Sequence, residues 1–150
     1  MEGQDGDGRV AREYQMIYTV TSTSPLDEIE RRLQESAARQ KFGVVAVHDL
    51  QEMLKKKGVD LAVECRIYEV CNPLQAKKVL EADGAISTAL PCRISVYGVP
   101  RNYTLATMRP TEMMKGFDNP DIEPIAREVE DVIFQMMRDA AGDEAGSGKG

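Results

Sequence analysis

The sequence predicts a two-layer α+β domain, with a mixed sheet of about five strands packed with helices and a long helix near the C-terminus. Segments with two different periodicities alternate along the chain. In one, apolar and polar residues alternate as in half-buried strands; in the other, apolar residues recur every three or four positions as in amphipathic helices. The resulting order is β-α-β-α-β-α-β-β-α, without an internal repeat. Each amphipathic element must bury one face, so a sheet covered by helices follows.

The length of the chain and its two ends set the predicted domain. A chain of 150 residues suits one domain with a single core. We expect residues 13–140 to form this domain. Residues 1–12 are predicted to be disordered and residues 141–150 to form a flexible tail, because both lack apolar periodicity.

The first predicted strand and helix lie in the N-terminal third. Apolar and polar residues alternate over residues 14–21, which predicts a half-buried strand. Ser24 and Pro25 then form an expected N-cap and first helical residue. A helical stripe runs from Leu26 to Ala37, and Gly43 is expected at the C-terminus of this helix.

A second strand and helix follow. The continuous apolar run over residues 44–47 predicts a strand covered on both faces. Asp49 and Glu52 form a variant capping box that opens a short helix, and this helix ends at Gly58 after the cations of residues 55–57. We expect three apolar residues of this helix to face inward: Leu50, Met53 and Leu54.

A third strand is predicted around residues 63–67. Cys65 lies there between Val63 and Ile67 at period two, so we expect it to be a plain core residue. Asn72 and Pro73 then provide an N-cap and first-turn pair for a helix that continues through Leu80.

The C-terminal part predicts a hairpin and a long helix. Cys92, Ile94 and Val96 share one strand face, and residues 103–108 are the returning strand. Pro110 interrupts the chain. From Asp121 a long helix carries an apolar stripe, which is expected to serve the domain core, a subunit contact or both: Ile122, Ile125, Val129, Val132, Ile133, Met136 and Met137.

Other side chains of this region have simpler interpretations. The acidic residues between Glu123 and Asp131 fit the solvated face of the long helix. The methionine pairs at residues 113–114 and 136–137 are expected to fill core or a subunit contact rather than to bind metal.

Composition argues against several classes of function. The net charge of −6 and the absence of tryptophan, with 3 Phe and 5 Tyr, argue against a nucleic-acid surface. A helix that crosses a membrane needs about 20 apolar residues in a row, and the sequence contains no such run. The N-terminus is acidic and glycine-rich, unlike a signal peptide. The three cysteines are odd in number and have apolar neighbours, which fits free thiols in a reducing compartment better than a disulfide framework. We therefore expect a soluble cytoplasmic protein.

Two cysteines lie beside turn signals. Cys71 is predicted where a strand passes into a helix, and Cys92 where a new strand begins after Pro91. The free N–H groups of a helix start can lower the pKa of Cys71 and make it reactive, whereas apolar burial would raise it. Core packing is the default interpretation of Cys92. The two thiols are nevertheless expected to approach each other without a standing disulfide.

This region is the predicted ligand-binding site. It combines the two cysteines with the residues that fix their elements: Cys71, Asn72, Pro73, Pro91 and Cys92. The catalytic candidates are the two cysteines alone.

His48 is the single histidine and a weak candidate for an acid, a base or a metal ligand. A zinc site needs about four ligands at recognisable spacing, and neither Cys-x-x-Cys nor His-x-x-x-His occurs. His48 could join Cys71 and Cys92 in a three-ligand site only if folding brings the three together. Glycine-rich phosphate loops and the Gly-x-Ser-x-Gly elbow are also absent from the sequence.

From Cys71 to Val99 the chain resembles the family catalogued as domain of unknown function 302, and the resemblance extends over most of residues 14–115. The residues that carry it are Phe42-Gly43-Val44, Cys71-Asn72-Pro73, Ala76, Leu80-Glu81-Ala82-Asp83, Leu90-Pro91-Cys92, Ile94-Ser95-Val96-Tyr97 and Pro110. The resemblance implies a small α/β protein, often dimeric, with no established general activity. Some members are fused or adjacent to sulfur-handling and redox proteins, which suggests thiol chemistry.

Three functions remain open from the sequence. The first is a homodimeric binding or accessory protein with a small-molecule or protein partner near Cys71 and Cys92. A thiol-based redox or sulfur-transfer protein is the second, with Cys71 as nucleophile and Cys92 as resolving thiol. The third is a metal or haem binder. No complete catalytic constellation is present, which favours the first function over an enzyme and leaves the cofactor unknown.

Overall fold

The computed structural model describes residues 16–142. The predicted disordered segment at residues 1–12 and most of the predicted C-terminal tail therefore lie outside the described residues. Ala141 was expected in that tail, but it closes the last helix and is buried.

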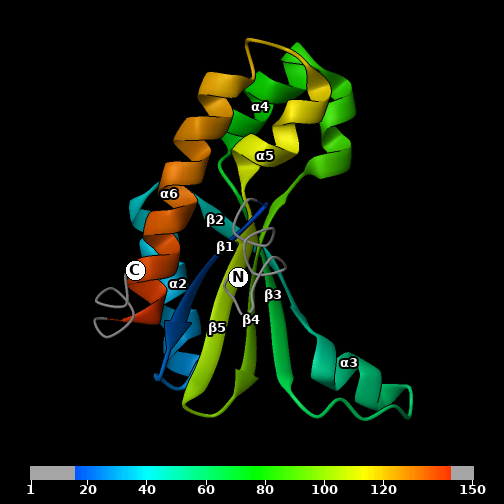
Figure 1. The fold of residues 1–150 in the computed structure, drawn as a ribbon, viewed down its shortest axis with the longest axis vertical. Helices are drawn as coiled ribbons and strands as arrows, with labels where there is room; N and C mark the ends of the chain where they lie inside the picture. The colour runs from blue at the N-terminus through cyan, green and yellow to red at the C-terminus, as the bar shows by residue number, and fades with distance from the viewer. Residues whose placement is uncertain (1–15, 143–150) are drawn as a thin grey trace, which may run out of the picture.

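A five-stranded antiparallel sheet forms one layer of the fold (Figure 1), and its strand order is β1-β5-β4-β3-β2. Its strands are β1 (Ile17–Ser22), β2 (Gly43–Asp49), β3 (Glu64–Cys71), β4 (Cys92–Val99) and β5 (Asn102–Met108). The α+β class and the order of strands and long helices agree with the prediction. A mixed sheet was expected, and this detail is wrong because all four pairings are antiparallel. The helical connections either cross to the opposite sheet edge or return to an antiparallel neighbour, so none links adjacent parallel strands.

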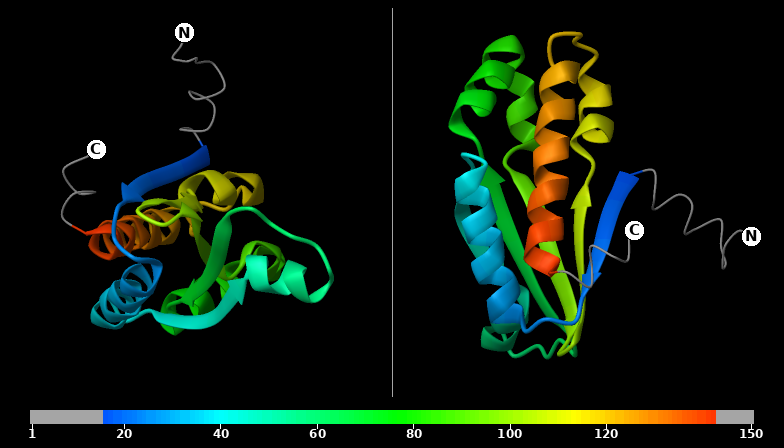
Figure 2. Two further views of the ribbon diagram at one scale, coloured as in Figure 1. Left: turned by 90° about the horizontal axis from the view of Figure 1, so that it is seen from below. Right: turned by 90° about the vertical axis from the view of Figure 1, so that its left-hand side faces the viewer.

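Two long helices form the second layer. Figure 2 shows α2 (Leu26–Arg39) and α6 (Glu123–Ala141) side by side across one face of the sheet. The opposite face carries exposed side chains such as Thr19, Arg93 and Tyr97. No helix within residues 16–142 is long and apolar enough to span a membrane.

The shorter helices gather at one end of the sheet, apart from α3, which projects at the other end (Figure 1). The group at the upper end consists of α4 (Pro73–Ala82), η1 (Gly84–Ala89), α5 (Pro110–Met114) and η2 (Lys115–Phe117). Pro110, expected to interrupt the chain, is the first residue of α5, a position that proline suits because its missing N–H needs no partner there.

The main core lies between the sheet and helices α2 and α6. Its fully buried side chains include Ile29, Leu33, Tyr68, Ile94, Leu105, Ile133, Met136 and Met137. Each large apolar side chain buried in this way contributes about 1.5–3 kcal/mol. The Tyr68 hydroxyl donates to Glu30 Oε1 of α2 at 2.8 Å, which gives the buried phenol a polar partner.

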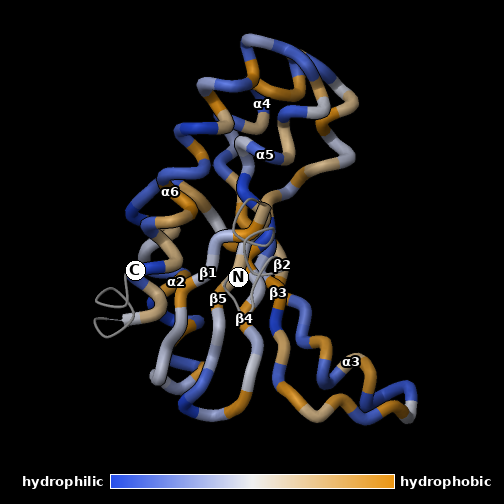
Figure 3. Tube along the Cα trace, viewed as in Figure 1, coloured by the Kyte–Doolittle hydropathy of each residue, from blue (hydrophilic) through white to orange (hydrophobic). Residues whose placement is uncertain are grey.

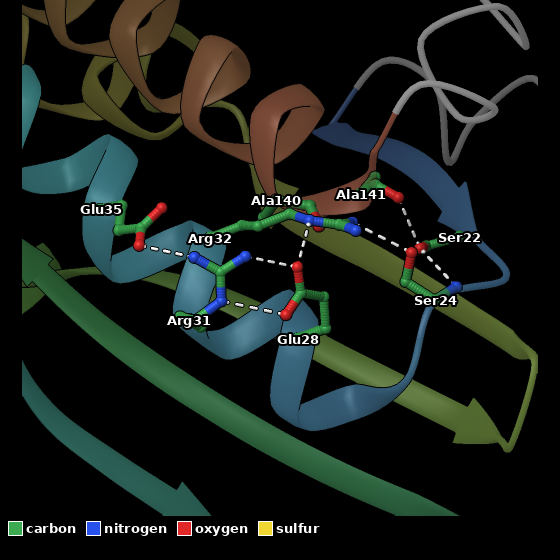
Figure 4. Close-up of polar contacts among 8 residues, drawn as sticks. All are labelled: Ser22, Ser24, Glu28, Arg31, Arg32, Glu35, Ala140 and Ala141. Carbon is green, nitrogen blue, oxygen red and sulfur yellow. Dashed lines mark hydrogen bonds and ion pairs between the residues drawn. The ribbon is translucent and has the colours of Figure 1, made fainter.

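The lower ends of α2 and α6 are joined by polar contacts, shown in Figure 4. Ser22 Oγ donates to the Ala141 carbonyl at 2.6 Å. Arg32 donates to Ser24 Oγ at 3.0 Å and to the Ala140 carbonyl at 3.4 Å. Ser24 is thus engaged with Arg32, and the predicted Ser24 N-cap is wrong: Pro25 is the N-cap residue, without a side-chain cap.

The predicted signals at the two ends of the second helix, Asp49 and Gly58, are confirmed. Asp49 caps α3 (Leu50–Lys56) by accepting from Glu52 N at 3.0 Å, and Gly58 follows this helix at φ 80°. Gly43 is a strand residue instead. Helix α2 ends earlier, at Arg39, and Lys41 takes the left-handed turn at φ 66°.

The β2–α3 region is far more exposed than predicted. Strand β2 is a sheet edge, and the expected double covering is wrong because Val45 and Val47 are 60% and 43% exposed. Helix α3 buries none of its residues, and Met53 is 49% exposed rather than inward-facing. Helix α3 and the loop of residues 57–63 project from the sheet and are called the α3 arm below; Figure 3 shows the apolar positions on it.

The two faces of β3 are the reverse of the prediction. Tyr68 and Val70 face the core, so Ile67 and Cys65 fall on the opposite, partly exposed face. Cys65 is therefore only half-buried. The apolar runs on both faces of this strand leave its register ambiguous in sequence, because a shift of one residue exchanges the faces.

The long helix is confirmed, but one of its acidic residues is not solvated. Glu130 is only 8% exposed and accepts from the Thr111 backbone N–H at 3.1 Å and from its hydroxyl at 2.7 Å. This pairing fastens α5 to α6.

Candidate ligand-binding cavity

A second, smaller core holds the upper helices together. Its buried residues come from α4, η1, α5 and the start of α6: Val79, Ile86, Met114, Ile122 and Ala126. This cluster stands beyond the sheet, so the space between it and the strand ends is not filled by the main core.

A cavity of about 440 Å³ occupies that space. Its walls come from the ends of β2, β3 and β4, from α4, η1 and α5, and from the first half of α6. The apolar wall residues are Phe42, Val45, Val70, Ala76, Val79, Leu80, Leu90, Pro91, Pro110, Met114, Ile125, Ala126 and Val129, and the others are Cys71, Asn72, Gln75, Ser87 and Cys92. None of these residues carries a charge. A cavity of this size and composition suits a small, mainly apolar molecule.

Cys71 reaches the wall because it is the last residue of β3, paired with Gly43 of β2. The chain then turns into α4, and Asn72 fixes this turn as predicted. Its Oδ1 accepts from Leu74 N at 3.0 Å and from Gln75 N at 3.1 Å. These bonds use two N–H groups of the helix start, so they are not free to bind an anion.

Cys92 enters the cavity wall from the first position of β4, opposite Val70. Together with Ile94 and Val96 it faces the core, as the sequence predicts, and it is 8% exposed. Burial raises the pKa of the Cys92 thiol to about 11, and the nearby Cys71 adds to this effect. Cys92 is therefore a protonated thiol near neutral pH.

The predicted site is assembled only in part. Cys71, Asn72, Pro91 and Cys92 all line one cavity, and the three cysteines of the chain are free thiols. Pro73 is exposed and does not line it; its place at the first position of α4 serves the helix.

Sequence reasoning missed Gln75, which lines the cavity from the first turn of α4. Its Oε1 is buried without a hydrogen-bond partner among the described residues. Its spacing from Val79, four positions later on α4, could have placed it on the inward face of that helix.

His48 lies elsewhere, toward the other end of β2. Its Nε2 is 3.1 Å from Glu69 Oε2, and Glu69 also faces Arg93 at 3.6 Å. These side chains come from three neighbouring strands on the face opposite the helices. Within residues 16–142 no three histidine, cysteine or acidic side chains are grouped to hold a metal, so the site of His48, Cys71 and Cys92 is not formed.

A smaller hollow of about 230 Å³ adjoins the cavity on the exposed sheet face. Pro91 and Cys92 belong to the walls of both. Arg93 lines only this second hollow, so a charged side chain lies in its wall and none lies in the wall of the cavity.

Comparisons with known proteins agree with this architecture. The family model described as "Domain of unknown function DUF302" matches residues 18–140. The chain is also similar to a solved structure, the crystal structure of uncharacterized conserved protein DUF302 from Bacillus stearothermophilus, with a TM-score of 0.79 and 29% identity. That match covers 85% of this chain and 98% of the other. No curated protein matches the chain. Since the family model spans most of the sequence, the chain belongs to the DUF302 family.

Proposed function

We propose that this protein binds a small, uncharged and mainly apolar molecule in the cavity between α4, α5, α6 and the strand ends. The observation that carries the proposal is the cavity itself, about 440 Å³ in volume and without a charged wall residue. A charged ligand would lose its hydration there without gaining an ionic partner, which is costly in apolar surroundings.

Binding of a reporter molecule tests this proposal. N-phenyl-1-naphthylamine is uncharged and apolar, and its fluorescence rises when it leaves water. Ala76→Trp places a large ring from α4 into the cavity, whereas Leu74→Trp adds the same ring at a position that is 72% exposed. We expect wild type and Leu74→Trp to bind the reporter and Ala76→Trp to lose at least tenfold in affinity.

A second variant that fills the cavity keeps the test valid if Ala76→Trp does not fold. Leu80→Trp alters a cavity residue that is already 39% exposed and so tolerates a larger side chain. Circular dichroism verifies that each variant is folded. Failure of wild type to bind, or equal binding by folded Leu74→Trp and Leu80→Trp, would rule out ligand binding in this cavity.

The second candidate is a thiol-based redox or sulfur-transfer protein, with Cys71 as nucleophile and Cys92 as resolving thiol. Two free thiols in one cavity wall favour it. The raised pKa of Cys92 disfavours it, because a resolving thiol attacks as thiolate. Mass spectrometry of untreated protein distinguishes the two functions by a persulfide or disulfide mass. The redox candidate also requires faster alkylation of Cys71 than of half-buried Cys65.

We also propose that the protein forms a homodimer. We place it in the cytoplasm, because free thiols are maintained in a reducing compartment. Two observations support the homodimer. The chain belongs to the DUF302 family, for which the sequence resemblance implies dimers, and several apolar side chains are exposed on the protomer surface. The stripe of α6 is mostly used inside the protomer, where Ile122, Ile133 and Met137 are buried. Exposed apolar residues gather instead on and beside the α3 arm: Val47, Met53, Val59 and Val63. A second copy of the chain is the partner we assign to this arm.

A further inference from the structure

We propose that the side-chain oxygen of Gln75 accepts a hydrogen bond from the ligand, so that the cavity selects uncharged molecules with one N–H or O–H group. This inference rests on the proposed function and adds the residue that determines specificity. The hydrogen-bond partners of the polar side chains in the cavity wall support it.

The other oxygen-bearing side chains of the wall already have partners. Asn72 Oδ1 accepts two backbone N–H groups of α4. Ser87 Oγ donates to the Gly84 carbonyl at 2.8 Å. The two cysteines offer only weak hydrogen-bonding sulfur atoms.

Gln75 differs because its Oε1 is buried and has no partner among the described residues. A buried acceptor without a donor is unfavourable, so the carboxamide gains from a rearrangement that brings its oxygen to a donor. The residue as a whole is only half-buried. A half-turn about its Cγ–Cδ bond exchanges the positions of oxygen and nitrogen, and this torsion is soft. The carboxamide can therefore present its oxygen to a bound molecule.

The surroundings favour a neutral donor over an ion. No basic or acidic side chain lines the cavity, and the first N–H groups of α4 are bonded to Asn72. An ammonium group would lack a counter-charge, and a carboxylate would find neither a cation nor a free helix start.

Carbazole and fluorene provide a matched pair of probes. The two tricyclic molecules have nearly the same shape, and carbazole carries an N–H where fluorene carries a CH₂. Displacement of N-phenyl-1-naphthylamine gives the affinity of each. The measured quantity is the ratio of carbazole to fluorene affinity in wild type and in Gln75→Met, which keeps the length of the side chain and removes its amide.

We expect Gln75→Met to lower this ratio about three- to tenfold, the size of one neutral hydrogen bond. The matched control is Gln34→Met, an exposed position on α2, which should leave the ratio unchanged. An unchanged ratio in Gln75→Met, with both probes bound, overturns the role of Gln75 and leaves the cavity function standing. If neither probe binds wild type, the cavity function fails and the role of Gln75 fails with it.

A measurement on wild type makes the test independent of folding of the variant. Carbazole should shift the side-chain amide NMR signals of Gln75 more than fluorene does. Equal shifts with the two probes would contradict the hydrogen bond.

Discussion

The Cys92 thiol shows how the packing of one residue sets its chemistry. Its position at the start of β4 puts it in the core, and burial raises its pKa from the ordinary 9.0 to about 11. The folded protein therefore holds this proton more tightly than the unfolded chain. The corresponding contribution to stability is fully present below about pH 9 and is lost as the pH rises through 11.

This difference predicts a pH-dependent effect of Cys92→Ala. In urea unfolding, wild type should exceed the variant in free energy of unfolding at pH 7, and the difference should shrink by up to about 2–3 kcal/mol between pH 9 and 11. Tyrosines that titrate in the same range are common to both proteins, so their effect cancels. A difference that stays constant to pH 11 would show that the thiol is not desolvated.

Gly98 is required by the close approach of two strands. It has φ 141°, and a Cβ atom there would lie 2.2 Å from the Asn102 carbonyl oxygen. We expect Gly98→Ala to lower the free energy of unfolding by about 2 kcal/mol or more, because both the backbone conformation and the contact become unfavourable. Gly84→Ala is the control, since no atom lies within 4 Å of its added Cβ. Similar losses in thermal melts of the two variants would refute this explanation.

At the scale of single elements, α4 depends on its cap. Asn72 bonds two N–H groups of the first turn, so Asn72→Ala should cost about 0.5–2 kcal/mol in unfolding free energy. Asn72→Asp keeps an accepting oxygen and should retain most of the stability. Since α4 is a wall of the cavity, Asn72→Ala should also weaken reporter binding. Equal stability of the Ala and Asp variants would mean that the cap is not formed in solution.

The elements that could be predicted are those whose local signals agree with their surroundings. The β4–β5 hairpin has period two on a buried face, and α4 and α3 have side-chain caps; all were predicted close to their observed positions. The two cysteines were placed at element ends by the same signals, and both line one cavity.

The features that were missed depend on tertiary context. The pattern of residues 44–47 is that of a buried strand, but its place in the strand order leaves it at an edge. Glu130 fits a solvated helix face until α5 packs against it and supplies Thr111 as a donor. Gln75 has no sequence signature beyond its helical spacing, because the cavity arises only where the upper helices stand away from the sheet.

For the whole molecule, the exposed apolar arm predicts self-association. Light scattering at micromolar concentration should give the mass of a dimer. Met53→Glu places a charge on the arm at a position that is already 49% exposed, so it should yield monomers without loss of fold. Lys55→Glu on the same helix reverses a charge at an exposed position and is the control. A monomer mass for wild type would contradict the proposed dimer.

Methionine methyl NMR distinguishes binding of a small uncharged molecule in the cavity beside Cys71 and Cys92 from binding elsewhere on the protein. Met114 lines the cavity, Met136 and Met137 are buried in the main core, and Met53 lies on the arm. Titration with N-phenyl-1-naphthylamine should shift the Met114 methyl signal progressively to saturation, while the signals of Met53, Met136 and Met137 stay in place. A Met114 signal that does not move, or a shift confined to Met53, would contradict ligand binding in this cavity.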